Sequence, residues 1–505
     1  MATYTSIQEG ETRLQSTDDR PLPSEDYVPR AMPQVLGTFD MTAAFIMAVF
    51  WISNVTTIVT GGPAGLTYFV LCCVAFFVPC AIVIAQLGVM FPYEGSLYNW
   101  TYKALGTFWS FFIALCGWLP GVLSLVSAAD VIVSVIQSLN PSWLVPAWQQ
   151  GLVIIFITIV VGFLSIQRYR MVQNVINVAA MLTIVAVVFI GVAALAWLLK
   201  GKPSATNFAD PTGWGISVAP QTNNLYLLGT VTLALLGANM PLNMAGELKD
   251  HKTILRHLLW GSLIVMGGYL IITFSILAVE GQNAAFTAPN SVALLLDAVD
   301  KGLGKFIGGL TAVCMMTFFI VVGVFENATS ARLLMVAALD ERLPFGVAQL
   351  NKQRIPANAI IFQTICACGF TAVIFFGTPL ITFLGNTAAL TTEAYTVTAA
   401  GLLLVWAFSF LFPFIDLAVL YFRHRTIFAP HRIFPMPVLI ISCIVGPLVC
   451  LATIVDTLVY SWIPTLIGNN TWWYLVGGLT AVCLTLSAVG SILASGEASW
   501  QQVNV

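Results

Sequence analysis

Long apolar runs recur along this chain, and they constrain its fold more strongly than any other feature of the sequence. A helix needs about 20 apolar residues to cross the hydrocarbon core of a bilayer. Runs of this kind lie at residues 38–60, 66–90, 107–138, 150–166, 171–199, 225–246, 256–279, 303–338, 358–377, 389–421, 436–460 and 472–495. We therefore predict an all-α membrane protein with twelve transmembrane helices.

The composition supports this prediction and excludes several functions. Only 8 % of the residues are charged, whereas an average soluble domain carries about 25 % charge. The net charge of −2 gives no basis for nucleic-acid binding. The cysteines lie in apolar runs without the spacing of a metal site or a disulfide framework. Because no H-E-x-x-H or G-x-S-x-G motif is present, we expect no enzyme activity, no cofactor and no bound metal.

The loops between the runs differ in positive charge from one side of the membrane to the other. With the N-terminus inside, 16 of the 20 Lys and Arg residues fall on the cytoplasmic side. The positive-inside rule therefore predicts this orientation, and an even number of spans places the C-terminus inside as well. We expect residues 1–35, which are polar, to form a disordered cytoplasmic tail. Residues 496–505 would form a second cytoplasmic tail.

Two of the predicted spans change character halfway along. In 38–60 the polar segment Ser53–Thr60 interrupts the apolar run, and in 225–246 the segment Gly237–Met240 precedes Pro241. Glycine costs a helix interior about 1 kcal/mol and proline about 3 kcal/mol. Interrupted spans in matching positions of two halves are typical of secondary transporters. The alternative is a simple kink, with Ser and Thr side chains bonding back to their own helix.

Four segments resemble, in the correct order, the motifs of the amino acid–polyamine–organocation permeases. Ala85–Gly106 reads AQLGVMFPYEGSLYNWTYKALG, which is similar to the family's A-E-L-x-x-x-F-P-x-x-G-G-x-Y. The other three segments are RYRMVQNVINVAAML, GANMPLNMAGELKDHKTILRHLLWG and SARLLMVAALDERLPFGVAQLNKQRIPANAI. The resemblance extends from about residue 36 to residue 460.

The resemblance implies a five-plus-five inverted-repeat fold of the LeuT type, with helices 1 and 6 broken at the substrate site. The repeats would span 36–220 and 221–425, followed by spans 11 and 12 in 426–495. The implied substrate-binding residues are Ser53, Asn54, Val55, Thr56, Gly237, Ala238 and Asn239. The sequence departs from the family pattern at three places: Ser53-Asn54-Val55 replaces the usual G-S/T-G, and Gln86 and Asn239 replace glutamates. Without the G-x-G, span 1 is more similar to the glutamate/GABA exchanger or fungal-type GABA permease branches.

Three carboxylates lie within apolar runs, where ionisable groups are costly and usually functional. By resemblance, Glu326 lines the substrate cavity, and we expect it to carry a proton or to pair with a substrate ammonium. The alternative is an ion pair with Arg332, although a spacing of six residues fits one helix face poorly. We expect Asp130 and Asp416 to act in gating or coupling, with Asp416 within reach of Arg168 or Arg332.

These observations predict a secondary active transporter that moves an amino acid or a related amine across the plasma membrane by alternating access. We expect proton symport or exchange, because span 5 has no internal lysine and only Thr329 and Ser330 in span 8 suggest a sodium site. The expected partners are a small-molecule substrate, membrane lipid and protons as coupling ion. The alternatives are a polyamine or organocation permease and a non-transporting amino-acid sensor on the same fold.

Overall fold

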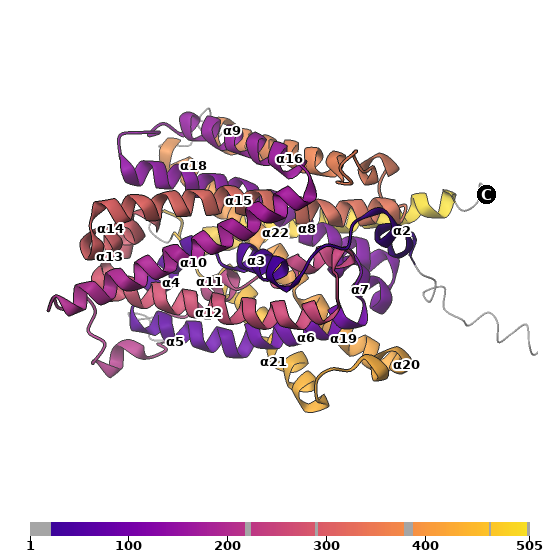
Figure 1. Cartoon of the computed structure of the whole chain (residues 1–505), viewed down its shortest axis with the longest axis horizontal. Coiled ribbons are helices and arrows are strands. Elements are labelled where there is room, and N and C mark those ends of the chain that lie inside the picture. Colours follow the sequence, from indigo (N-terminus) through magenta and orange to yellow (C-terminus); the bar gives the residue numbers. More distant parts are fainter. Residues whose placement is uncertain (1–21, 218–223, 288–290, 378–386, 464–465, 502–505) are drawn as a thin grey trace, which may run out of the picture.

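The computed structural model describes residues 22–217, 224–287, 291–377, 387–463 and 466–501. Within these ranges the regular structure is helical, apart from one bridge between Leu36 and Leu248. The long helices run roughly along one common direction (Figure 1). Helix α2 lies at one end of this bundle and α14 at the other; we call these the α2 end and the α14 end.

Ten helical segments of the described chain are long and apolar enough to cross a membrane. They are Pro63–Met90 (α5, η3 and α6), Thr107–Leu139 (α8), Ala147–Ser165 (α9), Tyr169–Leu199 (α10), Lys252–Val279 (α12), Lys305–Leu339 (α15), Ala357–Gly377 (α16 and η7), Ala394–Arg423 (in α18 and α19), Met436–Val459 (α21) and Asn469–Ala494 (in α22). The prediction of an all-α protein with many membrane-spanning helices is therefore confirmed.

The two predicted spans that lack a single long helix are 38–60 and 225–246, the two with interrupted sequences. The first contains α3 (Thr38–Val49), η2 (Ile52–Asn54) and α4 (Val55–Val59). The second contains α11 (Tyr226–Ala234) and η5 (Met240–Glu247). The remaining short helices include α2 (Pro23–Ala31), α7 (Ser96–Leu105), α13 (Gln282–Thr287), α14 (Ser291–Leu303) and α20 (Arg425–Phe428).

The outer surface of the bundle is apolar. Large side chains such as Phe156 and Phe163 on α9, Ile441 on α21 and Leu486 on α22 are more than half exposed. A soluble protein rarely exposes contiguous apolar surface on this scale. These faces therefore suit contact with lipid, while the buried core lies between α3, α8, α12 and α15.

The predicted disordered tail is wrong in its second half. Residues 1–21 lie outside the described residues, but Pro23–Ala31 forms α2, which docks on the bundle. The backbone N–H and the hydroxyl of Ser24 both donate to the carboxylate of Asp340, at 2.9 Å each. Lys103 lies 2.8 Å from Glu25, and the side chain of Val28 is buried. These partners are distant in the sequence, so composition alone does not reveal the helix.

Candidate substrate site at two broken helices

The first break lies between α3 and η2, at Phe50 and Trp51. Both residues leave helical geometry, with ψ of 70° at Phe50 and 95° at Trp51. The predicted unwound residues instead lie just beyond the break: Ser53 and Asn54 are in η2, and Val55 and Thr56 begin α4. The sequence-based position of this break is therefore wrong by about one turn.

The physical reason is that the polar side chains of this segment do not need an unwound backbone. The hydroxyl of Thr56 donates to the backbone oxygen of Ser53 at 2.8 Å. Serine and threonine can satisfy their hydroxyl groups in this way inside a membrane helix. Polar residues in an apolar run thus identified the span that is broken, but they did not mark the residues at which the helix breaks.

The second break lies between α11 and η5, at residues 235–239. Gly237 has φ of +110°, a backbone conformation that residues with a side chain rarely adopt. Pro241 is in the first turn of η5, where a missing N–H removes no helical hydrogen bond. This break coincides with the interruption predicted from Gly237 to Met240, and it begins two residues earlier.

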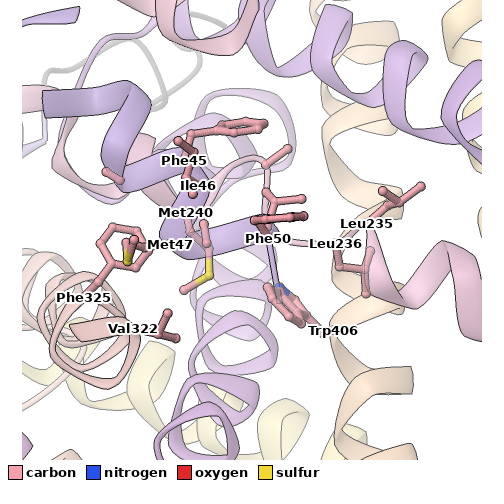
Figure 2. Packing of buried hydrophobic residues seen from close by; sticks show 14 of the residues in the cluster. Phe45, Ile46, Met47, Phe50, Leu235, Leu236, Met240, Val322, Phe325 and Trp406 are labelled. Atoms are coloured by element: carbon pink, nitrogen blue, oxygen red, sulfur yellow. The ribbon is translucent and has the colours of Figure 1, made fainter. Parts of the chain in front are cut away.

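The two breaks are in direct contact. A Cβ atom on Gly237 would lie only 2.7 Å from the backbone oxygen of Ala48, in the last turn of α3. The same Cβ would lie 3.5 Å from the ring of Trp406. Figure 2 shows Trp406 close to Phe50 and Leu236, which come from the two breaks. The absence of a side chain at Gly237 therefore allows the two chain segments to approach.

Tyr269 of α12 joins the two breaks. Its hydroxyl lies 3.2 Å from the backbone oxygen of Val49, 3.1 Å from that of Trp51 and 3.4 Å from that of Ala234. A phenolic hydroxyl has one proton, so these three oxygens share one donor. The side chain of Asn54 also interacts with this hydroxyl. Sequence reasoning missed Tyr269, because a tyrosine in an apolar span carries no recognisable motif.

The walls around the breaks are mainly apolar. Figure 2 shows Met47, Met240, Val322 and Phe325 grouped beside the broken segments. Asn239 is buried, and its side-chain oxygen has no hydrogen-bond partner among the described residues. Backbone groups freed by the breaks, with a few polar side chains, are thus set in an apolar surrounding. Small-molecule sites are commonly built in this way.

A small cavity lies between η5, α10 and α15, beside the buried Arg332. This cavity, between Tyr169, Met244, Phe325 and Arg332, has a volume of about 10 Å³. A volume of about 10–15 Å³ is needed to hold one water molecule. An amino acid therefore requires these side chains to move before it can occupy this space.

Glu326 is completely buried in α15, and it does not pair with Arg332. Neither carboxylate oxygen of Glu326 has a hydrogen-bond partner among the described residues. Arg332 instead lies 2.8 Å from Glu94 and 2.6 Å from Glu247. The sequence-based alternative, in which Arg332 neutralises Glu326, is therefore wrong. Sequence spacing could not identify the true partners of Arg332, which come from other elements.

Glu94, Glu247 and Arg332 form a buried cluster at the α2 end. Burial and the neighbouring Glu247 raise the pKa of Glu94 to about 8, although Arg332 opposes this shift. Next to this cluster, the N–H of Leu36 donates to the backbone oxygen of Glu247 at 3.0 Å. The α2 end thus links the segment before α3 to the end of η5.

Asp130 and Asp416 lie elsewhere. The hydroxyl of Thr101 on α7 donates to Asp416 at 2.8 Å, so the predicted contact of Asp416 with Arg168 or Arg332 is not present. Asp130 on α8 lies near Tyr395, which is within 3.0 Å of the Ser127 hydroxyl. The structure therefore does not bring either carboxylate to the two breaks.

Comparison with known proteins identifies the family. The chain matches the amino acid permease family over residues 36–489. It is 22 % identical over 347 residues to an uncharacterized transporter of Legionella pneumophila, covering 66 % of this chain and 72 % of the relative. A 78-residue segment is 35 % identical to a probable polyamine transporter of Arabidopsis thaliana, covering 13 % of this chain and 16 % of that protein. Together with the helical membrane fold, the family match over most of the chain shows that this protein is a transporter of the amino acid permease family.

Proposed function

We propose that this transporter moves an amino acid or a related amine by alternating access, as a proton symporter or an exchanger. The contact between the two helix breaks is the observation that carries this proposal. It brings backbone oxygens of Val49, Trp51 and Ala234, from the end of α3, the first break and the end of α11, to one hydroxyl, within 3.4 Å. Unwound backbone at membrane depth is tolerated where it lines a cavity or is buried in protein.

The proposed architecture has twelve spans, in which α3–η2–α4 and α11–η5 are spans 1 and 6. Residues 36–220 and 221–425 form two inverted repeats, and residues 426–495 contribute spans 11 and 12. The α2 end faces the cytoplasm of a cell whose plasma membrane holds the protein, because the excess of Lys and Arg lies on that side. Lipid covers the apolar outer faces.

In the proposed site, the broken helices bind the two charged ends of the substrate. Free carbonyl groups at the end of a helix attract an ammonium group, and free N–H groups at the start of a helix attract a carboxylate. The residues that we assign to substrate binding are Ser53, Asn54, Val55, Thr56, Gly237, Ala238, Asn239 and Glu326. Asp130 and Asp416 are assigned to gating, and Glu326 also to coupling.

We expect a neutral or zwitterionic substrate. The broken segments have no charged side chain of their own, and Glu326 supplies a single carboxyl group. A polyamine would need several carboxylates to offset the loss of hydration of its charges. The partial similarity to the plant protein supports polyamine transport as the second candidate.

A ligand screen tests the proposal directly. Purified protein is heated with each of the twenty amino acids, GABA, putrescine or spermidine, and unfolding is followed by intrinsic fluorescence. A ligand at 100 times its Kd stabilises the folded state by about 2.7 kcal/mol. We expect stabilisation by one or a few amino acids and none by the polyamines. Stabilisation by a polyamine and by no amino acid would favour polyamine transport over amino acid transport.

An Asn54→Leu variant then locates the site. Because Asn54 lies beside the contact of the two breaks, this change should abolish both the stabilisation and uptake into proteoliposomes. Asn358→Leu is the matched control, since Asn358 is exposed at the start of α16. Normal uptake by the Asn54 variant would show that the substrate binds elsewhere.

A further inference from the structure

Two polar groups that have no hydrogen-bond partner among the described residues, the Ser330 hydroxyl and the Gln363 amide nitrogen, meet where α8, α15 and α16 pack together. Ser330 of α15 and Gln363 of α16 both approach Gly121 of α8: the Ser330 hydroxyl contacts the position of a Gly121 Cβ, and Gln363 Nε2 lies 3.6 Å from it. Both side chains are completely buried. Among the described residues, neither the Ser330 hydroxyl nor Gln363 Nε2 has a hydrogen-bond partner.

Gln363 is held in one orientation. The indole N–H of Trp118 donates to Gln363 Oε1 at 3.1 Å. The amide oxygen therefore faces Trp118, and Nε2, which carries two N–H donors, faces Ser330 and Gly121. Buried polar groups are nearly always hydrogen-bonded, so unpaired donors at this depth require an explanation.

Helix geometry places Glu326 on the same face of α15 as Ser330. It lies four residues before Ser330, and residues at this spacing share one face of a helix. Gly117 packs on Leu333 and Gly121 packs on Ser330, so α8 and α15 run antiparallel here. Glu326 therefore faces α8 one turn further from the α2 end. Both of its oxygens lack a hydrogen-bond partner in the described part of the chain. Phe325, its neighbour in the chain, faces the broken helices (Figure 2).

We propose that Glu326, Ser330 and Gln363 form a proton-binding site where α8, α15 and α16 pack together. This proposal rests on the proposed function and deepens it, because it assigns the coupling ion and two residues that position it. In the described conformation Glu326 is neutral, since an unpaired buried carboxylate would be very costly. On release, the O–H bond of Glu326 breaks and the proton passes to water. The remaining carboxylate then accepts hydrogen bonds from the Ser330 hydroxyl and Gln363 Nε2.

The charged groups around α15 do not occupy this site. Helices α9 and α16 contain no Asp, Glu, Lys, Arg or His. Asp130 of α8 is nine residues from Gly121, which places it on the opposite face of an α-helix. The other charged groups on α15 and the elements packed against it lie toward the ends of α15: Lys305 with Asp297, Asp300 and Lys301 of α14 at one end, and Arg332 with Glu247, Asp40, Arg170, Lys103, Glu25, Asp26 and Arg30 at the other.

Infrared spectroscopy of the purified protein tests the site without any substrate. A protonated buried carboxyl group has a C=O stretching band, which disappears when the group loses its proton. The intensity of this band is measured as the pH is raised. Because Glu94 is also a buried carboxyl group with a raised pKa, the band of Glu326 is read from the difference between the native spectrum and that of Glu326→Gln, where we expect one such band.

The Ser330→Ala, Gln363→Met double variant lacks the two groups that would donate hydrogen bonds to the carboxylate. The midpoint of its Glu326 titration should therefore rise by about one pH unit, a tenfold change in proton affinity. An unchanged midpoint, or the absence of a carboxyl band from the native-minus-Glu326→Gln difference, would overturn the proposal.

Two controls separate the donors from general packing effects. Ser165→Ala removes a buried hydroxyl that is already bonded to Val161, so the midpoint should not move. Ser330→Thr keeps the hydroxyl group that Ser330→Ala removes, so the titration midpoint of this variant should equal that of the native protein. If the double variant does not fold, Ser330→Ala alone carries the same test with a smaller shift in the same direction.

Transport measurements separate this proposal from the proposed function. Proteoliposomes are given a radiolabelled mixture of amino acids, with and without an imposed pH gradient. In the double variant, gradient-driven accumulation should fall at least tenfold while exchange of labelled for unlabelled amino acid is unchanged. If the native protein shows only exchange but the infrared midpoint shifts as expected, symport is wrong and the proton site stands. Accumulation driven by sodium, with an unshifted midpoint, would overturn the site itself.

Discussion

The two helix breaks differ in what produces them. The break between α11 and η5 contains Gly237, with φ of +110°, and is followed by Pro241. The break between α3 and η2 contains Phe50 and Trp51, with φ of −91° and −83°, and neither glycine nor proline. The break between α11 and η5 is therefore encoded in local backbone chemistry. The break between α3 and η2 needs support from residues distant in the sequence.

That support comes mainly from α12. The ring of Phe50 lies over Gly268, where a Cβ atom would be only 2.7 Å from the ring. It also meets Tyr269 edge to face, with ring centroids 4.9 Å apart. The Tyr269 hydroxyl lies within hydrogen-bond distance of two carbonyl groups at the break, those of Val49 and Trp51. One turn of α12 thus provides both the space and the hydrogen bond that the first break requires.

Gly237→Ala should have the largest effect. The added Cβ would require an unfavourable φ and would clash with the backbone of Ala48, so we expect a loss of about 3 kcal/mol in the free energy of unfolding. Unfolding in mixed detergent and SDS micelles measures this loss. Gly309→Ala, where a Cβ meets nothing within 4 Å, should raise stability slightly, by about 0.5 kcal/mol. Equal behaviour of the two variants would contradict the close contact of the breaks.

Gly268→Ala should have the next largest effect. It tests how α12 supports the first break. The new methyl group would press on the Phe50 ring, and overpacking of this kind costs about 1–3 kcal/mol. The neighbouring Gly267→Ala is the matched control, since a Cβ there meets nothing within 4 Å. Substrate affinity, measured by thermal stabilisation, should fall only for the Gly268 variant. If both variants bind equally well, the Phe50 position does not shape the site.

Tyr269→Phe should have a moderate effect. It keeps the ring packing and removes the donor shared by Val49, Trp51 and Ala234, at a cost of about 1 kcal/mol. Because the donor serves both breaks, uptake into proteoliposomes should fall more than stability does. Tyr474→Phe, at a site that is 75 % exposed, should change neither. Unaltered uptake by the Tyr269 variant would mean that water or another group replaces the hydroxyl without loss.

Pro241→Ala should have the smallest effect, below about 1 kcal/mol. Pro241 is in the first turn of η5, and the conformation of Gly237 already produces the break. The same unfolding assay compares the loss in the free energy of unfolding of this variant with that of Gly237→Ala. A loss as large as that of the Gly237 variant would show that proline, rather than glycine, ends the helical path.

The sequence predicted the larger features of this protein well, because they depend on composition and local chemistry. Apolar runs are long enough to locate the spanning helices, and Gly237 with Pro241 locates the second break within two residues. The first break was placed one turn too late, since Thr56 bonds to Ser53 and needs no unwound backbone. Helix α2 was missed, because Ser24 meets Asp340 across 316 residues of chain.

By itself, then, the sequence determined which segments are apolar enough to cross a membrane, the membership of the permease family, and the break that glycine imposes on its own backbone. Only the tertiary structure decided the position of the first break, the partners of Arg332, and the complete burial of Glu326. The physical reason is the range of the interactions. Hydropathy and φ preferences act within a few residues, whereas ring packing, ion pairs and shared hydrogen bonds join atoms that only the fold brings together.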